Sequence, residues 1–303
     1  MGDHRAVSYG LKLPARSLAA LAGQENCRWA VGTTALREEN EVHVLELDSR
    51  LASLRPVESY AHPDEIWAIV PHPSKHNQVA TVANAGGRSR ARIWNMEPAH
   101  NSLDLVGELE TGAGLGSSGG GRFKALCWHP SSPEQLITVS ESRLRRWTVR
   151  DASIDMVSDA GAGDLHQLWT AAWDPHDPSR LLTAGGCNIQ VWDLRTMKKA
   201  GEIEAAHQMP VRDLDFSRQE LHRCVSSGDD GRICFWDLRS TKPAQPLQAF
   251  QAHAHWVQSF EDHEDSIYAG AWNVSDPWTF AYLCYDGRVT VQTVPQQHRS
   301  KGS

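Results

Sequence analysis

Two glycine-rich patterns are the first candidates for chemistry in this chain of 303 residues. Residues 114–119 fit G-x-G-x-x-G, the pattern of dinucleotide sites, and residues 116–120 fit G-x-S-x-G, the pattern around a nucleophilic serine. Both chemistries need a helix directly after the glycines. Residues 123–128, FKALCW, instead continue with a strand pattern. We therefore expect neither a nucleotide site nor a catalytic serine.

Three histidines, His253, His255 and His263, are the next candidates, as ligands of a metal ion. No set of Cys, Asp or Glu stands with them at ligand spacing, and two of the three occupy the opening position of a repeat described below. The neighbouring carboxylates of Asp229 and Asp230 fall in a predicted turn, where aspartate has a structural role. The sequence therefore predicts no metal, no cofactor and no enzymatic activity.

Charge and hydropathy exclude further classes. The formal net charge of −7 leaves no basic footprint for nucleic acid. No apolar run approaches the twenty residues of a membrane span, and the first ten residues contain no apolar signal-peptide core. The six cysteines are scattered and form no C-x-x-C pair, as expected for buried thiols in a reducing compartment. We expect a cytoplasmic globular protein that does not insert into membranes.

The stretch from Ala206 to Leu238 shows which elements organise the chain. It opens with His207 and continues with an alternating segment at 211–216 and a small-residue segment at 225–228. An Asp-Gly turn then leads into residues 233–237, ICFWD. Alternation predicts half-buried strands, and Asp-Gly between apolar runs is a strong hairpin signal. The stretch therefore predicts three short antiparallel strands.

The same unit recurs along the chain. One set of aromatic residues stands late in an apolar run (Trp94, Trp147, Trp192 and Trp236), and a second set ends an earlier run (Trp128, Trp173, Phe216 and Trp272). Trp147 and Trp192 are 45 residues apart, and Trp192 and Trp236 are 44 apart. Four strands in about 40–45 residues, closing on Trp-Asp, are typical of the blades of a propeller.

The segments VWDLR (191–195) and FWDLR (235–239) carry a resemblance to the WD-repeat family that extends over nearly the whole chain. It implies an all-β fold, a WD40 β-propeller over residues 1–303. It also implies a hydrogen-bonded set of histidine, serine, aspartate and tryptophan within a blade. Here the set is His207, Ser227 (with Ser226 as the other choice), Asp230 and Trp236. The other repeats lack at least one of these types.

Six units are recognisable. The first is expected to contain strands at 8–13, 28–34 and 41–47, with a fourth at 51–60; the last opens at His263 and ends near Pro295. Its closing strand either comes from the N-terminus or is absent. A seventh opening at 252–258 is not completed, which predicts a seven-bladed ring lacking most of one blade; the alternative is six blades with 239–262 as a loop.

Three further expectations concern the remaining segments and the core. Residues 97–122 are predicted to be a flexible Gly/Ser-containing insert. Residues 296–303 are predicted to be a disordered tail. The predicted core comprises the aromatic residues of the two repeating sets except Trp94, together with Phe235.

Two functions follow from resemblance alone. Residues 261–295 and 206–216 look like WD-repeat adaptors that act with endosomal and Golgi tethering complexes. This implies a role in endosome-to-plasma-membrane recycling and in trans-Golgi and dense-core vesicle trafficking, at the periphery of those membranes. The alternative uses Arg195 and Arg239 of two W-D-x-R motifs, which resemble those of substrate receptors that bind a cullin-4 ubiquitin ligase adaptor.

Overall fold

The computed structural model describes residues 6–22, 27–48, 53–109, 121–150, 153–161, 168–239, 245–251, 267–274, 276, 278–284 and 286–293. In this part of the chain the regular structure is β-strand, arranged in six antiparallel four-stranded sheets that we call blades one to six. None of the described residues belongs to a helix that could cross a membrane. The chain divides into two compact units, each with three blades.

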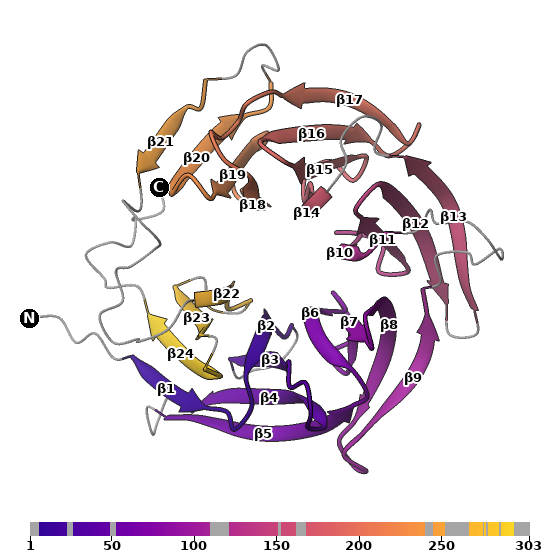
Figure 1. Cartoon of the computed structure of the whole chain (residues 1–303), viewed down its shortest axis with the longest axis vertical. Coiled ribbons are helices and arrows are strands. Elements are labelled where there is room, and N and C mark those ends of the chain that lie inside the picture. Colours follow the sequence, from indigo (N-terminus) through magenta and orange to yellow (C-terminus); the bar gives the residue numbers. More distant parts are fainter. Residues whose placement is uncertain are drawn as a thin grey trace, which may run out of the picture. The chain divides into compact units, whose positions relative to one another are not determined.

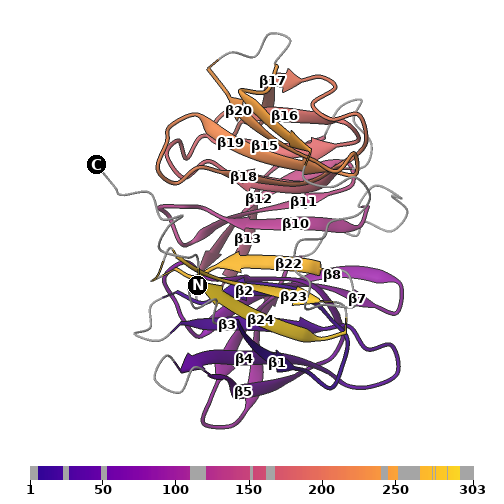
Figure 2. The ribbon, with the colours of Figure 1, turned by 90° about the vertical axis from the view of Figure 1, so that its left-hand side faces the viewer.

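Unit 1 contains blades one, two and six (Figure 1). Blade one consists of β2 (Ala15–Ala20), β3 (Arg28–Thr33), β4 (Asn40–Asp48) and β5 (Ser53–His62). Blade two consists of β6 (Glu65–Pro71), β7 (Gln78–Ala85), β8 (Arg88–Glu97) and β9 (Ser102–Glu108). Blade six consists of β22 (Ile267–Trp272), β23 (Thr279–Cys284), β24 (Arg288–Thr293) and β1 (Val7–Gly10). Figure 2 shows β2 to β5 stacked in chain order.

Unit 2 contains blades three, four and five. Blade three consists of β10 (Phe123–Trp128), β11 (Gln135–Ser140), β12 (Arg143–Arg150) and β13 (Ser153–Gly161). Blade four consists of β14 (Leu168–Trp173), β15 (Arg180–Gly185), β16 (Asn188–Asp193) and β17 (Lys198–Ile203). Blade five consists of β18 (Val211–Phe216), β19 (Arg223–Gly228), β20 (Arg232–Asp237) and β21 (Gln248–Gln251).

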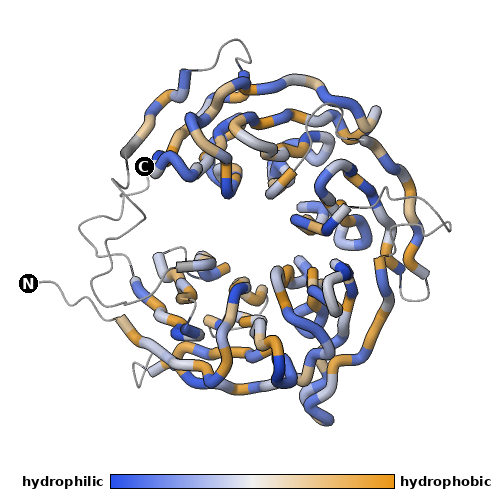
Figure 3. Tube along the Cα trace, in the orientation of Figure 1, coloured by the Kyte–Doolittle hydropathy of each residue, from blue (hydrophilic) through white to orange (hydrophobic). Residues whose placement is uncertain are grey.

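Apolar clusters between neighbouring blades form the core of each unit. In unit 1 one cluster joins blade six to blade one and another joins blade one to blade two. In unit 2 the clusters join blade three to four and blade four to five. Figure 3 shows the hydrophobic residues that recur along the strands. A single blade has two apolar faces, and packing against the neighbouring blades buries both of them. The ends of the strands stay uncovered by this packing.

Blade six takes its fourth strand from the N-terminal segment. β1 pairs with β24, with Val7 opposite Val291, and Ser8 Oγ lies 2.9 Å from Thr290 Oγ1. Of the two alternatives left open for the closing strand, the structure shows the one in which it comes from the N-terminus. The assignment of 8–13 to blade one is wrong. The backbone N–H and C=O groups of an edge strand can pair with any strand that has unpaired groups, and here that strand is β24 of blade six.

The boundaries of the predicted insert also need correction. Residues Ser102–Glu108 form β9, the fourth strand of blade two, so the insert does not begin at 97. The short strand β21 of blade five had no counterpart in the sequence prediction. The glycine patterns at 114–120, the unfinished opening at 252–258 and the tail at 296–303 lie outside the described residues.

Most of the predicted aromatic core is buried, with 9% exposure or less at Trp128, Trp147, Trp173, Trp192, Phe216 and Trp236. Two predictions are wrong, because Phe235 is 40% exposed and Trp272 is 57% exposed. Adjacent strand residues point to opposite faces. Since Trp236 takes the buried face of β20, Phe235 points away from it. Trp272 contacts the Phe280 ring of its own blade, at a centroid distance of 5.0 Å.

Candidate functional site

Blade five contains a buried chain of polar contacts around His207. Its Nδ1 donates to Asp230 Oδ1 at 2.9 Å, and its Nε2 lies 2.7 Å from Ser226 Oγ. The indole Nε1 of Trp236 donates to the same oxygen at 2.8 Å. The prediction of Ser227 is wrong, because the two serines point to opposite faces of β19 and only Ser226 is on the face shared with Trp236.

The carboxylate of Asp230 holds the turn as well as the histidine. It accepts backbone hydrogen bonds from Gln208 at 2.9 Å and Arg232 at 3.1 Å. Burial acts to raise the pKa of Asp230, but the bonds from His207 and the two backbone amides outweigh it and lower that pKa. All these partners belong to the same blade, so the set stabilises the blade.

The other tryptophans of the same register use a threonine. Nε1 donates to a threonine Oγ1 at 2.8–3.0 Å in each of three blades: Trp94 to Thr81, Trp147 to Thr138 and Trp192 to Thr183. In blade two His62 Nε2 also lies 3.2 Å from Thr81 Oγ1. Each threonine stands in the second strand of its blade, so the signal for this bond is present in the sequence.

The two W-D-x-R arginines lie at the surface of blades four and five. The Arg195 side chain is 77% exposed, and its guanidinium donates to Asp193 through Nε at 3.1 Å and Nη2 at 3.0 Å. Arg239 is 67% exposed and forms the same two-point contact with Asp237. These arginines lower the pKa of both aspartates. Each pair therefore presents a fixed guanidinium to solvent.

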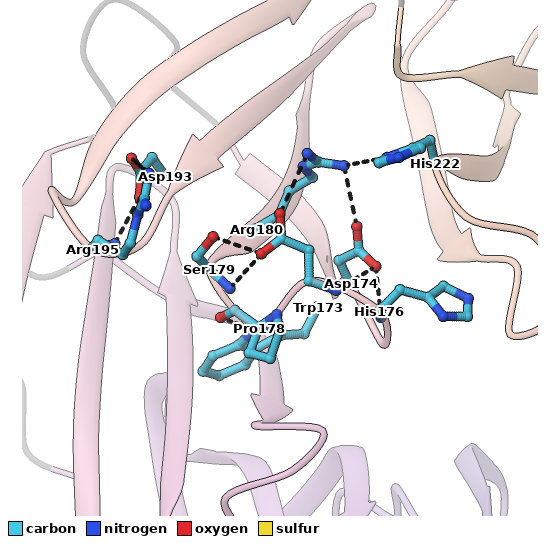
Figure 4. Close-up of polar contacts among 10 residues, drawn as sticks. Trp173, Asp174, His176, Pro178, Ser179, Arg180, Asp193, Arg195 and His222 are labelled. Atoms are coloured by element: carbon cyan, nitrogen blue, oxygen red, sulfur yellow. Dashed lines mark hydrogen bonds and ion pairs between the residues drawn. The ribbon is translucent and has the colours of Figure 1, made fainter.

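A polar network that the sequence did not predict lies beside Arg195 (Figure 4). Figure 4 shows Arg180 at its centre, with Nη1 donating to Asp174 Oδ2 at 3.4 Å and to His222 Nδ1 at 3.0 Å. Asp174 is 1% exposed, and the carbonyl of His222 accepts the backbone N–H of Leu238 in blade five, so Arg180 connects the turns of two blades. Asp177 forms an ion pair with Arg180 and accepts a hydrogen bond from the Ser179 hydroxyl. The bond from Ser179 lowers the pKa of Asp177.

We call this surface the unit 2 rim, defined by Asp193–Arg195, Asp237–Arg239 and Arg180. Each arginine of the rim forms an ion pair with an aspartate: Arg195 with Asp193, Arg239 with Asp237, and Arg180 with Asp174. Among the described residues no three His, Cys, Asp or Glu side chains gather as metal ligands. The histidines His253, His255 and His263 lie outside the described residues. What the rim can do chemically is bind a protein surface with oriented hydrogen-bond donors.

The turn between the first two strands of a blade is built from one side-chain acceptor. The residue directly after the first strand accepts two successive backbone amides in blades two to five: His72, His129, Asp174 and Ser217. Such side chains mimic a backbone turn. In blades three to five the sequence signal of this turn is a polar residue directly after the aromatic that ends the first strand, whereas in blade two Pro71 precedes the acceptor His72.

The chain is similar to known β-propeller proteins over most of its length. The EIPR1 beta-propeller family model matches residues 3–272. The WD repeat-containing protein DWA2 of Arabidopsis thaliana is 31% identical over 353 aligned positions, which cover 97% of each chain. The human EARP and GARP complex-interacting protein 1 is 25% identical over 382 positions, and the Caenorhabditis elegans EARP-interacting protein 1 is 27% identical over 363. They cover 98% and 97% of each chain.

These alignments are longer than the chain itself, so each places residues of the relative opposite gaps in this chain. The missing blade predicted from the opening at 252–258 stays a prediction, since the gaps have no assigned position. The four-stranded blades, the recurring position of tryptophan in the third strand and the family match over most of the chain all indicate the same fold. This chain belongs to the EIPR1 beta-propeller family, whose fold is a WD40-like propeller.

Proposed function

We propose that this protein is a non-enzymatic adaptor that binds the EARP and GARP tethering complexes. Its proposed place is the cytoplasmic side of endosomes and the trans-Golgi network. There it assists recycling from endosomes to the plasma membrane and the sorting of dense-core vesicle cargo. The observation that carries the proposal is the match, over nearly the full length, to relatives named for interaction with EARP and GARP.

The chemistry of the described residues supports an adaptor. The buried polar groups His207, Asp230 and Ser226 bond to one another, which is a structural use. The exposed charges of the unit 2 rim are held in fixed geometry by neighbouring aspartates. Fixed guanidinium groups on rigid strands suit protein recognition, because little side-chain freedom is lost on binding.

The test is affinity purification of the full tagged chain from cells, with mass spectrometry of the recovered proteins. We expect subunits of EARP and GARP to be enriched over a control purification with an unrelated propeller. Loss of the protein should also slow the return of internalised receptors to the cell surface. Recovery of neither complex above the control overturns the proposal.

A second candidate function is the cullin-4 substrate receptor. The observation that favours it is the same exposed Asp–Arg pair at the same position of adjacent blades, at Arg195 and Arg239. A double substitution, Arg195→Glu with Arg239→Glu, should abolish recovery of the cullin-4 adaptor if that function is correct. Arg150→Glu is a suitable control, because Arg150 is 61% exposed in the same register of blade three but lacks the preceding aspartate. Unchanged adaptor recovery would exclude this second function.

A further inference from the structure

Every blade has a β-bulge at the same place in its first strand. The register between the first and second strands skips one residue near the start of the ladder in all six sheets. The skipped residues are Arg16, Trp67, Lys124, Trp169, Arg212 and Tyr268. A bulge leaves its extra residue out of the ladder and redirects the side chain, often beside a functional site.

The six bulge residues alternate in chemical type, with a cation in one blade and an aromatic ring in the next. Within each unit the alternation produces stacking, because first strands of neighbouring blades contact each other. We call Arg16, Trp67 and Tyr268 of unit 1 the Arg16 triplet. We call Lys124, Trp169 and Arg212 of unit 2 the Trp169 triplet.

The Trp169 triplet is balanced in charge. Lys124 Nζ lies 4.3 Å from the centre of the Trp169 ring, and Arg212 Cζ lies 5.0 Å from it. Each cation also has a carboxylate partner: Lys124 Nζ is 3.3 Å from Glu141, and Arg212 Nε donates to Asp229 at 2.7 Å. This triplet therefore offers a partner an aromatic surface but little uncompensated charge.

The Arg16 triplet differs in this respect. Arg16 Cζ lies 5.4 Å from the centre of the Trp67 ring and 5.8 Å from that of Tyr268. The Arg16 side chain is exposed, and no carboxylate among the described residues forms an ion pair with it. Tyr268 is 46% exposed. Cation–π contacts orient a guanidinium but leave its edge N–H groups available as donors.

We propose that the Arg16 triplet is a docking site for an acidic segment of a partner protein. A carboxylate of the segment accepts two hydrogen bonds from the Arg16 guanidinium, and an adjacent apolar side chain packs on Trp67 and Tyr268. Arginine matches a carboxylate in two-point geometry, and arginine with aromatic rings is typical of interface hot spots. The identity of the partner rests on the proposed function; the site itself does not.

A single-stranded nucleic acid is the other class of ligand that uses cations and aromatic rings. It needs several cations to neutralise successive phosphates, whereas the Arg16 triplet supplies one, in a protein of net charge −7. One carboxylate and one apolar group match one guanidinium between two rings. The observations therefore favour a peptide.

The test selects random phage-displayed dodecapeptides on the full-length protein and measures the affinity of the selected peptides by fluorescence polarisation. We expect selected peptides to be rich in Asp and Glu next to an apolar residue. Arg16→Gln should weaken them about tenfold, the loss of one charge-assisted contact. Trp67→Ala should also lower the affinity of the peptides, and Arg16→Lys should lower it less than Arg16→Gln does. The control Arg150→Gln should leave the affinity unchanged. Circular dichroism melting confirms that each variant is folded.

Three outcomes overturn the inference: selection without acidic enrichment, equal affinity in Arg16→Gln and the wild type, or tighter binding of an oligothymidylate than of any selected peptide. Affinity purification with Arg16→Gln then separates the two proposals. If the wild type recovers EARP and GARP and the variant recovers them equally, the docking role of Arg16 toward these complexes fails and the proposed function stands. If the wild type recovers neither, the proposed function fails, while peptide selection still decides the docking site.

Discussion

Trp236 donates its indole N–H to Ser226 Oγ at 2.8 Å, across adjacent strands of blade five. The same oxygen lies 2.7 Å from His207 Nε2, so one hydroxyl satisfies two buried groups. Both Ser226 and Trp236 are 1% exposed. A buried donor without a partner costs the full desolvation of that group, so this hydroxyl has a larger effect on stability than an exposed one.

The first prediction compares adjacent serines. Ser226→Ala should lower the free energy of unfolding by about 1–3 kcal/mol, because Trp236 Nε1 and His207 Nε2 lose their shared partner. Ser227→Ala should change it by less than about 0.5 kcal/mol, as for ordinary substitutions outside such networks. Urea titration of both variants measures the difference. Equal effects would show that Ser226 does not hold the set together.

A pH dependence follows from Asp230. Its pKa is lowered in the folded protein, so the carboxylate stabilises the fold above its unfolded pKa of about 4, and this contribution is lost as the pH falls towards the folded pKa. Asp230→Asn should be less stable than the wild type at neutral pH, and the two should converge in acid. Urea titrations at a series of pH values test this. A constant difference across that range would contradict it.

Blade four should depend on the bond from Trp192 to Thr183, which is 0% exposed. Thr183→Val keeps the shape but removes the acceptor, so we expect a loss of about 1–3 kcal/mol in the free energy of unfolding. Thr148→Val, in a half-buried position of β12, is the control. In a double-mutant cycle, Trp192→Phe should remove most of the effect of Thr183→Val. Additive effects would argue against direct coupling.

Gly32 is a close contact between the first two blades. A Cβ at Gly32 would lie 2.5 Å from Ile66 Cγ2 and 2.5 Å from Ser17 Oγ. Gly32→Ala should therefore destabilise the protein by about 1–3 kcal/mol through overpacking. Gly161→Ala introduces a methyl group with no atom within 4 Å and should be nearly neutral. Thermal unfolding of the two variants distinguishes them, and equal melting temperatures would disprove the close contact.

Cys224 should be protected from alkylation in the folded protein. The thiol is 2% exposed, and burial, with a smaller effect of nearby carboxylates, raises its pKa to about 12. The thiolate is the reactive form, so iodoacetamide at mildly alkaline pH should label Cys224 only after unfolding in urea. The half-buried Cys187 should react earlier. Peptide mass spectrometry gives both rates, and comparable rates in the folded state would refute the prediction.

The closing strand and Ser226 show where prediction from sequence reached its limit. The N-terminal segment reads as a strand, but whether it pairs with β3 or with β24 depends on which ladder is open after folding. The choice between Ser226 and Ser227 depends on the phase of β19 relative to β20, and a shift by one residue reverses the faces. Phe235 was assigned to the core for the same reason, since an apolar run does not reveal its phase.

The sequence by itself determined the repeat, its strand content and most of the buried aromatic residues. Trp147, Trp192 and Trp236 recur at nearly equal spacing, and such spacing requires a backbone that repeats in the same way. Tertiary structure alone decided the strand partners, the Arg180 network and the alternation that begins with Arg16 and Trp67. A bulge is visible only once two strands are in register, and the cation of a bulge meets the aromatic ring of the next bulge only when two blades stack. Such contacts join residues whose proximity no local pattern encodes.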